Sequence, residues 1–131
     1  MNAYKLFVLD VGLLGAMSEL PAESILEGND IFVEFKGALT EQYVLQQLIS
    51  DTPYTPYYYG NEKATFEQDF LIQKAKSIVP IEVKAEQNIR SHSLKTYCEK
   101  FQPEEAVRFS TLKYKEQERM VNIPLYAVCN L

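Results

Sequence analysis

The sequence is poor in the residues from which several common sites are built. It has no tryptophan, a single histidine (His92) and two cysteines, Cys98 and Cys129, among 131 residues. One histidine excludes the zinc sites that combine several histidines. The two cysteines fit no Cys-x-x-Cys pattern, so we expect reduced, buried thiols rather than a metal site or a disulfide framework. No segment approaches the run of about 20 apolar residues that a membrane helix needs.

Two further absences concern location and nucleotide binding. The N-terminal sequence lacks the basic stretch, apolar run and small-residue cleavage site of a secretory signal, so we expect a cytoplasmic protein. No GxxxxGK[ST] phosphate loop occurs, which excludes ATP binding by this chain in the P-loop manner. The formal net charge of −5 argues against a broad phosphate-binding surface. It does not exclude a nuclease, because a divalent cation would offset part of the acidic charge.

Length and composition predict one ordered domain over residues 1–131, and the order of the expected strands and helices predicts the α/β class. Apolar residues make up 47% and charged residues 24%, which is an ordinary globular balance. Residues 1–28 are expected to form a short strand and a short apolar helix, KLFVLDVGLLGAM, followed by a loop. The core behind them should be a central mixed sheet of about four or five strands with helices on both faces.

The main helix is expected over residues 30–50, with Asn29 or Asp30 as its cap. Glu41 falls within the apolar stripe of this helix or at its edge. The stripe follows helical spacing and comprises Ile31, Phe35, Ala38, Leu45 and Ile49.

Further elements follow from β-propensity, turn residues and capping. Strands are expected at residues 57–59, 66–73, 78–85 and 106–112, with a tight connection over 74–77. A helix is expected over 92–101, with Ser91 as its cap and with Leu94, Tyr97, Cys98 and Phe101 facing inward. The charged residues 113–119 are expected to be a solvated turn or loop, and the final NIPLYAVCNL is buried as either helix or strand.

Two charged residues, Glu82 and Lys84, interrupt an otherwise apolar strand and share one of its faces. If residues 69–73 and 78–84 form a hairpin, Asp69 lies opposite one of them, and either register points all three side chains to one face. Two neighbouring carboxylates repel unless a cation lies between them, and Mg²⁺ or Mn²⁺ is the usual solution. With Glu41 as a third oxygen ligand, the set matches metal-assisted hydrolysis of a phosphodiester.

A simpler interpretation stands beside this one. Glu82 and Lys84 can form an ion pair on a solvated sheet face, and Glu41 can reach to solvent. The tyrosines at 54 and 57–59 can stack on bases, but a half-buried strand with polar tips is the better interpretation.

The order Glu41, Asp69 and Glu82-Val83-Lys84 resembles the PD-(D/E)XK nuclease superfamily, which includes type II restriction enzymes and archaeal Holliday-junction resolvases. A closer resemblance covers nearly the whole chain. It is to the domain of unknown function that follows the ATPase core in many bacterial and archaeal AAA-type ATPases, a domain considered similar to those nucleases. The segments that carry it are, in order, KLFVLDVGLLGAM, GALTEQYVLQQL, EQDFLI, IVPIEVKAE, HSLKTYCEKF and NIPLYAV.

The resemblance implies a restriction-endonuclease-like core and a DNA-directed, metal-dependent nuclease domain. Its metal ligands for Mg²⁺ or Mn²⁺ would be Asp69, Glu82 and Glu41. Lys84 would orient water or stabilise charge beside Asp69 and Glu82, and Glu67 falls on a second acidic position. The chain would be the C-terminal part of a longer AAA-type ATPase, or a stand-alone remnant of one.

The chain also departs from the family pattern. Gln46 and Gln47 stand where the family often has a second helical glutamate, and Gln68 stands where the proline of the signature is expected. The missing second helical glutamate and the acidic charge favour an alternative, a non-catalytic docking or regulatory module of the ATPase that binds a protein partner or DNA.

Overall fold

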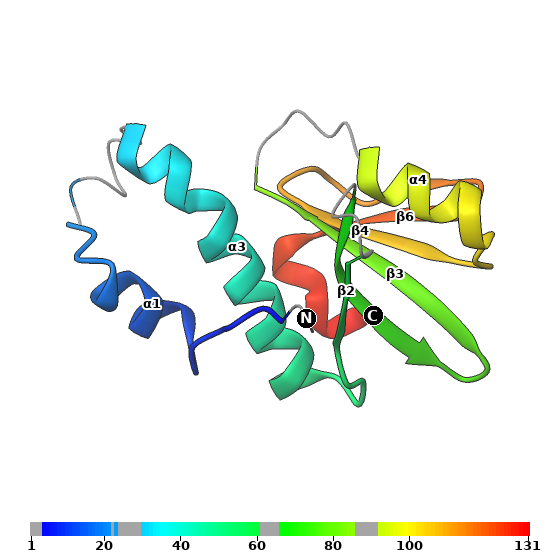
Figure 1. Ribbon diagram of the computed structural model, residues 1–131, viewed down its shortest axis with the longest axis horizontal. Coiled ribbons are helices and arrows are strands. Elements are labelled where there is room, and N and C mark those ends of the chain that lie inside the picture. The colour runs from blue at the N-terminus through cyan, green and yellow to red at the C-terminus, as the bar shows by residue number, and fades with distance from the viewer. Residues whose placement is uncertain (1–3, 22, 24–29, 61–65, 86–91) are drawn as a thin grey trace.

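The structure is a computed structural model that describes residues 4–21, 23, 30–60, 66–85 and 92–131. Within these residues the chain forms a six-stranded mixed sheet in the order β1-β2-β3-β4-β6-β5. Helix α3 packs on one side of the sheet and helix α4 on the other (Figure 1). The predicted α/β class, with a mixed sheet flanked by helices, is confirmed.

The sheet combines an antiparallel hairpin with a parallel centre. The pairs β3–β4 and β4–β6 are parallel, and β1–β2, β2–β3 and β5–β6 are antiparallel. The strands are β1 (Tyr57–Gly60), β2 (Glu67–Lys74), β3 (Ser77–Lys84), β4 (Ala106–Ser110), β5 (Lys115–Gln117) and β6 (Met120–Pro124). The helices are α1 (Val11–Met17), α3 (Asp30–Asp51), α4 (His92–Phe101) and the 3₁₀ helix η1 (Leu125–Asn130).

The predicted strand at the start of the chain is wrong. Residues 4–10 lie outside helices and strands and run beside α3. The side-chain amide of Gln42 takes the place of a neighbouring strand, because its Oε1 accepts the Val8 N–H at 3.0 Å and its Nε2 donates to the Val8 carbonyl at 2.9 Å. Gln46 accepts the Val11 N–H at 2.9 Å in the same way. The expected apolar helix then follows as α1.

The main helix is confirmed, but the predicted apolar stripe is out of phase. The side chains of Val44 and Leu48 enter the core with that of Gln42 beside them, while Ile49 and Ala38 are exposed. Adjacent helix positions differ by about 100°, so a stripe drawn one residue too late points away from the sheet. The buried face of α3 includes the polar Gln42, so a pattern of apolar residues alone does not identify that face. The side chain of Ile31 lies outside the described residues.

The other predicted elements are largely confirmed. In α4, Leu94 and Tyr97 are buried, whereas Cys98 is half-buried and Phe101 is exposed at the helix end. The proposed caps Asn29 and Ser91 lie outside the described residues. The final segment is both strand and helix, β6 followed by η1.

Two predictions about the second half of the chain are corrected. Strand β5 lies within the segment predicted as a solvated turn; all three of its residues are exposed at the sheet edge, where charged side chains are tolerated. Cys129 is free but exposed, not buried. Among the described residues, no helix has the length and hydrophobicity to cross a membrane.

Candidate functional site

The β2–β3 hairpin forms in the register that the motif requires. Its ladder runs from Lys74↔Ser77 to Phe70↔Ile81, and one further step would set Asp69 opposite Glu82. Beyond Phe70 the hydrogen bond to β3 is made by the Asp69 side chain and not by the β2 backbone: the Val83 N–H donates to Asp69 Oδ2 at 2.8 Å. The end of β2 is thus held to β3 by a carboxylate instead of a continued ladder.

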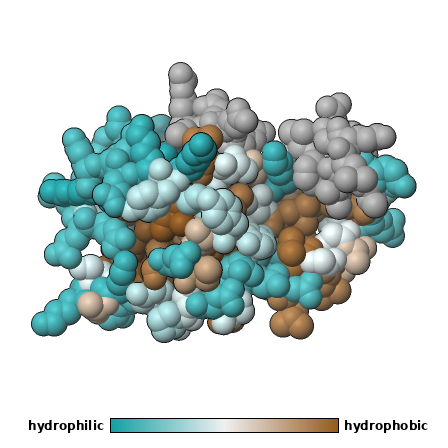
Figure 2. Space-filling model, turned by 180° about the vertical axis from the view of Figure 1, so that it is seen from behind, coloured by the Kyte–Doolittle hydropathy of each residue, from teal (hydrophilic) through white to brown (hydrophobic). Residues whose placement is uncertain are grey.

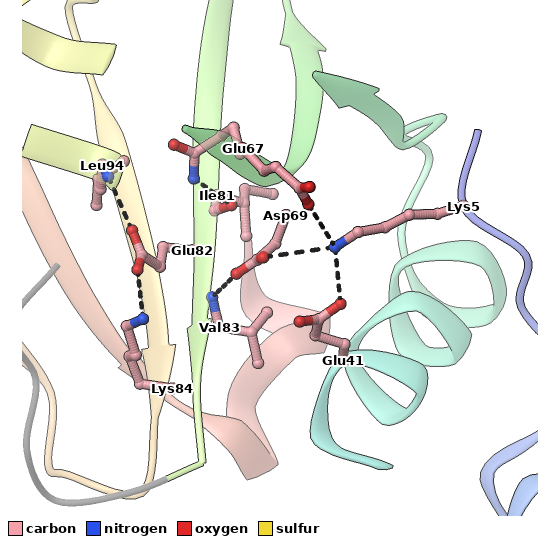
Figure 3. A network of polar contacts seen from close by, with 10 residues as sticks. Lys5, Glu41, Glu67, Asp69, Ile81, Glu82, Val83, Lys84 and Leu94 are labelled. Atoms are coloured by element: carbon pink, nitrogen blue, oxygen red, sulfur yellow. Dashed lines mark hydrogen bonds and ion pairs between the residues drawn. The ribbon is translucent and has the colours of Figure 1, made fainter. Parts of the chain in front are cut away.

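Glu82 and Lys84 form a close ion pair on the α4 side of β3 (Figure 3). Lys84 Nζ lies 2.6 Å from Glu82 Oε1, and the Leu94 N–H at the start of α4 donates to Glu82 Oε2 at 2.9 Å. The Glu82 residue is only 3% exposed. A buried carboxylate needs such partners, so this pair joins β3 to α4.

Asp69 points instead toward α3, into a cluster of carboxylates around Lys5 (Figure 3). Lys5 Nζ lies 3.1 Å from Glu41 Oε2, 3.8 Å from Asp69 Oδ1 and 3.9 Å from Glu67 Oε2. We call these four residues the Lys5 cluster. It brings Glu41, Asp69 and Glu67 together as the motif suggested, but around an ammonium group of the N-terminal segment.

The predicted site therefore divides into two groups on different sides of β3. The expectation that hairpin parity points Asp69, Glu82 and Lys84 to one face assumed that the ladder continues past Phe70, and it does not. Each of the four carboxylate oxygens of Asp69 and Glu82 contacts a donor within the protein. In the part of the chain that the structure describes, no group of three or more His, Cys, Asp or Glu residues can hold a metal ion. In this conformation the residues do not fit a shared Mg²⁺ or Mn²⁺.

The electrostatics of the Lys5 cluster are unusual. The pKa of Asp69 is raised from 3.8 to about 6, chiefly by burial and then by the negative charge of Glu41, which together outweigh the opposing effects of the Val83 N–H and Lys5. Burial by itself lowers the pKa of Lys5, but the three carboxylates outweigh it and raise that pKa above 10.5. Lys5 therefore stays charged in the neutral range.

A second polar group, which the sequence interpretation missed, crosses the sheet on the Glu82 side. Glu82, Arg108 and Asn122 are neighbours on β3, β4 and β6, and all three are buried. Arg108 Nε donates to Asn122 Oδ1 at 2.9 Å, and Ser110 Oγ donates to the same oxygen at 2.8 Å. In the sequence of β4, Arg108 and Ser110 alternate with apolar residues, and this pattern could have indicated that both polar side chains share one face of the strand.

Comparison with known proteins places the chain in a family. Residues 36–128 match the family model described as "Domain of unknown function (DUF4143)". No curated protein and no solved structure matches the chain. The matched range contains all six strands, α4 and most of α3, whereas Lys5 precedes it. Because the match covers more than half of the sequence, the chain belongs to the DUF4143 family of domains of unknown function.

Proposed function

We propose that this chain is a non-catalytic interaction domain, which serves as a docking or regulatory appendage of an AAA-type ATPase and binds a protein partner. The observation that carries the proposal is the internal use of the motif carboxylates. Asp69 and Glu82 each contact protein donors through both oxygens and are directed toward different helices. Their charges thereby hold elements of the domain together. The link to an ATPase rests on the family resemblance of the sequence.

The surface supports a protein partner over DNA. The net charge of −5 gives little affinity for phosphates. Large apolar side chains are exposed along the N-terminal segment and α1, including Leu6 at 86% and Leu9 at 85%. Hydrophobic residues reach the surface on the right of Figure 2, the side on which α1 and α3 lie. Exposed apolar side chains gathered on one side of a domain are typical of protein–protein contacts.

The first test is metal binding and cleavage. Wild-type protein and Asp69→Ala are titrated with Mn²⁺ by calorimetry and incubated with single-stranded, double-stranded and branched DNA. We expect neither protein to cleave DNA and the two to show the same weak Mn²⁺ affinity, since Asp69 already contacts Lys5 and Val83. Mn²⁺-dependent cleavage by the wild type that a folded Asp69→Ala variant has lost would overturn the proposal.

A second test addresses docking. Leu6→Ser and Leu9→Ser are each expected to weaken binding of the domain to the ATPase core by about tenfold. Burying a leucine side chain in an apolar contact contributes about 1.5 kcal/mol or more to the binding free energy, and serine loses this contribution. Ile78→Ser, which changes an exposed apolar residue at the start of β3, is the matched control and should leave binding unchanged. Equal affinities for all three variants, measured by surface plasmon resonance, would count against this surface.

The second candidate function is Mg²⁺- or Mn²⁺-dependent phosphodiester hydrolysis on DNA. The raised pKa of Asp69 and the crowding of three carboxylates favour it, because such perturbations gather at functional sites. It requires another arrangement, with Lys5 withdrawn and Asp69 turned toward Glu82. In that case Lys5→Met should strengthen Mn²⁺ binding by leaving the carboxylates without a cation. Mn²⁺-dependent DNA cleavage by this variant would support the nuclease; under the docking proposal the variant cleaves no DNA, even if the three carboxylates gain Mn²⁺ affinity.

A further inference from the structure

Residues 4–10, which we call the arm, run beside α3 with two different faces. The side chains of Lys5 and Phe7 are half-buried against the domain, whereas those of Tyr4 and Leu6 are exposed. Side chains that alternate in this way are typical of an extended peptide bound to a protein surface. In that mode the main chain supplies hydrogen bonds and the alternate side chains supply specificity. The contacts of the arm therefore indicate what kind of peptide this surface accepts.

The ammonium group of Lys5 lies in a site that the folded domain supplies. Besides the three carboxylates of the Lys5 cluster, the ring of Tyr58 contacts the ammonium, with its centroid 5.3 Å from Nζ. These groups come from α3, β1 and β2, and none belongs to the arm. A cation is attracted both to carboxylates and to the face of an aromatic ring. The site thus has the composition that suits a lysine side chain.

Two further contacts fix the next residues of the arm. The ring of Phe7 packs near that of Phe70, with centroids 5.8 Å apart. The buried side-chain amide of Gln42 bonds to both the N–H and the carbonyl of Val8, at 3.0 and 2.9 Å. The domain therefore contacts a lysine, an aromatic side chain two residues later, and the main chain of the residue after it. We call these groups of the domain the arm site, which comprises Glu41, Gln42, Tyr58, Glu67, Asp69 and Phe70.

The arm is attached loosely to this site. None of residues 4–10, all of which the structure describes, is buried. A cavity of about 180 Å³ remains between the arm and α3, lined by residues of both and by Leu14 of α1. Segments with few buried apolar contacts open locally at a small cost in free energy. The arm can therefore leave its site while the sheet stays folded, and a competing peptide can take its place.

We propose that the arm site is a peptide-binding site, which the arm occupies as an internal competitor and which receives an extended segment of a partner protein. That segment carries a lysine and, two residues later, an aromatic side chain, as the arm does. The three carboxylates and the net charge of −5 favour such a basic partner. This inference does not rest on docking through Leu6 and Leu9, which are exposed on the outer face of the arm. Since displacement of the arm also moves these two leucines, the two binding events compete.

The test measures binding of a fluorescein-labelled peptide with the sequence of residues 4–10, YKLFVLD, to the full chain by fluorescence anisotropy. Wild-type protein is expected to bind it weakly, because the arm is covalently linked to its site and competes at a high effective concentration. Lys5→Ser removes the lysine of the arm but no group of the arm site. This variant should bind the peptide about tenfold more tightly, since the arm loses a hydrogen bond between charged groups worth about 1.5 kcal/mol.

A second variant releases the arm in another way. Val8→Pro removes the N–H that Gln42 accepts, so it should also bind the peptide more tightly than the wild type does. Lys76→Gln is the matched control for Lys5→Ser, because it removes an exposed cation at the β2–β3 turn, outside the arm and its site. It should bind the peptide as the wild type does. A peptide with methionine in place of its lysine should bind Lys5→Ser about tenfold more weakly.

Two results would overturn the proposal. The first is that Lys5→Ser and Val8→Pro, with thermal unfolding curves like that of the wild type, bind the peptide no more tightly than Lys76→Gln. The second is equal affinity of Lys5→Ser for the lysine and methionine peptides, because the carboxylates and Tyr58 would then not select the ammonium group. Either failure leaves the docking proposal to be decided by its own variants at Leu6 and Leu9.

Discussion

Glu82→Ala is expected to lower the free energy of unfolding by about 3 kcal/mol, at the low end of what breaking a buried ion pair costs. The substitution leaves the Leu94 N–H without its acceptor and Lys84 without its carboxylate 2.6 Å away. It also removes the negative charge beside the buried Arg108. The side chain of Lys84 is 31% exposed and regains some hydration, which is why we expect the lower end of the range. Urea denaturation at neutral pH measures the loss.

Two further variants separate the charge from the hydrogen bond. Glu82→Gln keeps an acceptor for the Leu94 N–H and should lose less stability than Glu82→Ala. Glu99→Ala removes a carboxylate from the exposed pair with Lys95, at 3.8 Å, and should cost less than about 0.5 kcal/mol. If Glu82→Ala proves no more destabilising than Glu99→Ala, Glu82 does not join β3 to α4 as described.

Much of the fold could be predicted because its signals are local. The β2–β3 hairpin follows from two apolar runs joined by a short polar connection, where Ala75 adopts a φ of 55°. Helix α4 shows a clear apolar spacing through Leu94 and Tyr97. The phase of α3 and the path of residues 4–10 could not be predicted, because they depend on a buried polar contact between Gln42 and the Val8 backbone, 34 residues apart.

The candidate site was predictable in its members but not in its arrangement. Sequence order and alternation identified Asp69, Glu82 and Lys84 and their hairpin. Parity along a strand holds only while the ladder continues, and here it ends at Phe70↔Ile81. The role of Lys5 could not be predicted, because the sequence around a lone lysine in an apolar segment indicates neither where its side chain points nor which distant carboxylates it contacts. Long-range ion pairs of this kind decide whether clustered carboxylates face one another or a cation.

Asp69→Asn is expected to stabilise the protein at neutral pH and to change how its stability depends on pH. The pKa of Asp69 is about 6 in the folded protein and near 3.8 when exposed, so the unfolded chain gives up this proton first as pH rises. Wild-type stability should therefore fall between about pH 4 and 6 relative to the variant. This difference between the pKa of Asp69 in the folded and in the unfolded protein corresponds to a loss of at most about 3 kcal/mol in the free energy of unfolding above pH 6.

The attraction between Asp69 and Lys5 is already contained in the pKa of about 6, so its loss does not reduce this gain further. An asparagine oxygen can still accept the Val83 N–H. The measurement is the free energy of unfolding of both proteins from pH 4 to pH 7. Glu67→Gln is the matched control, because Glu67 contacts the same ammonium at 3.9 Å but its side chain is 52% exposed. That variant should follow the wild-type curve within about 0.5 kcal/mol, as exposed ion pairs do. A wild type that gains stability over Asp69→Asn as pH rises from 4 to 6 would mean that Lys5 outweighs burial and Glu41 at Asp69. The Lys5 cluster would then be a stabilising ion pair and not a strained group of carboxylates.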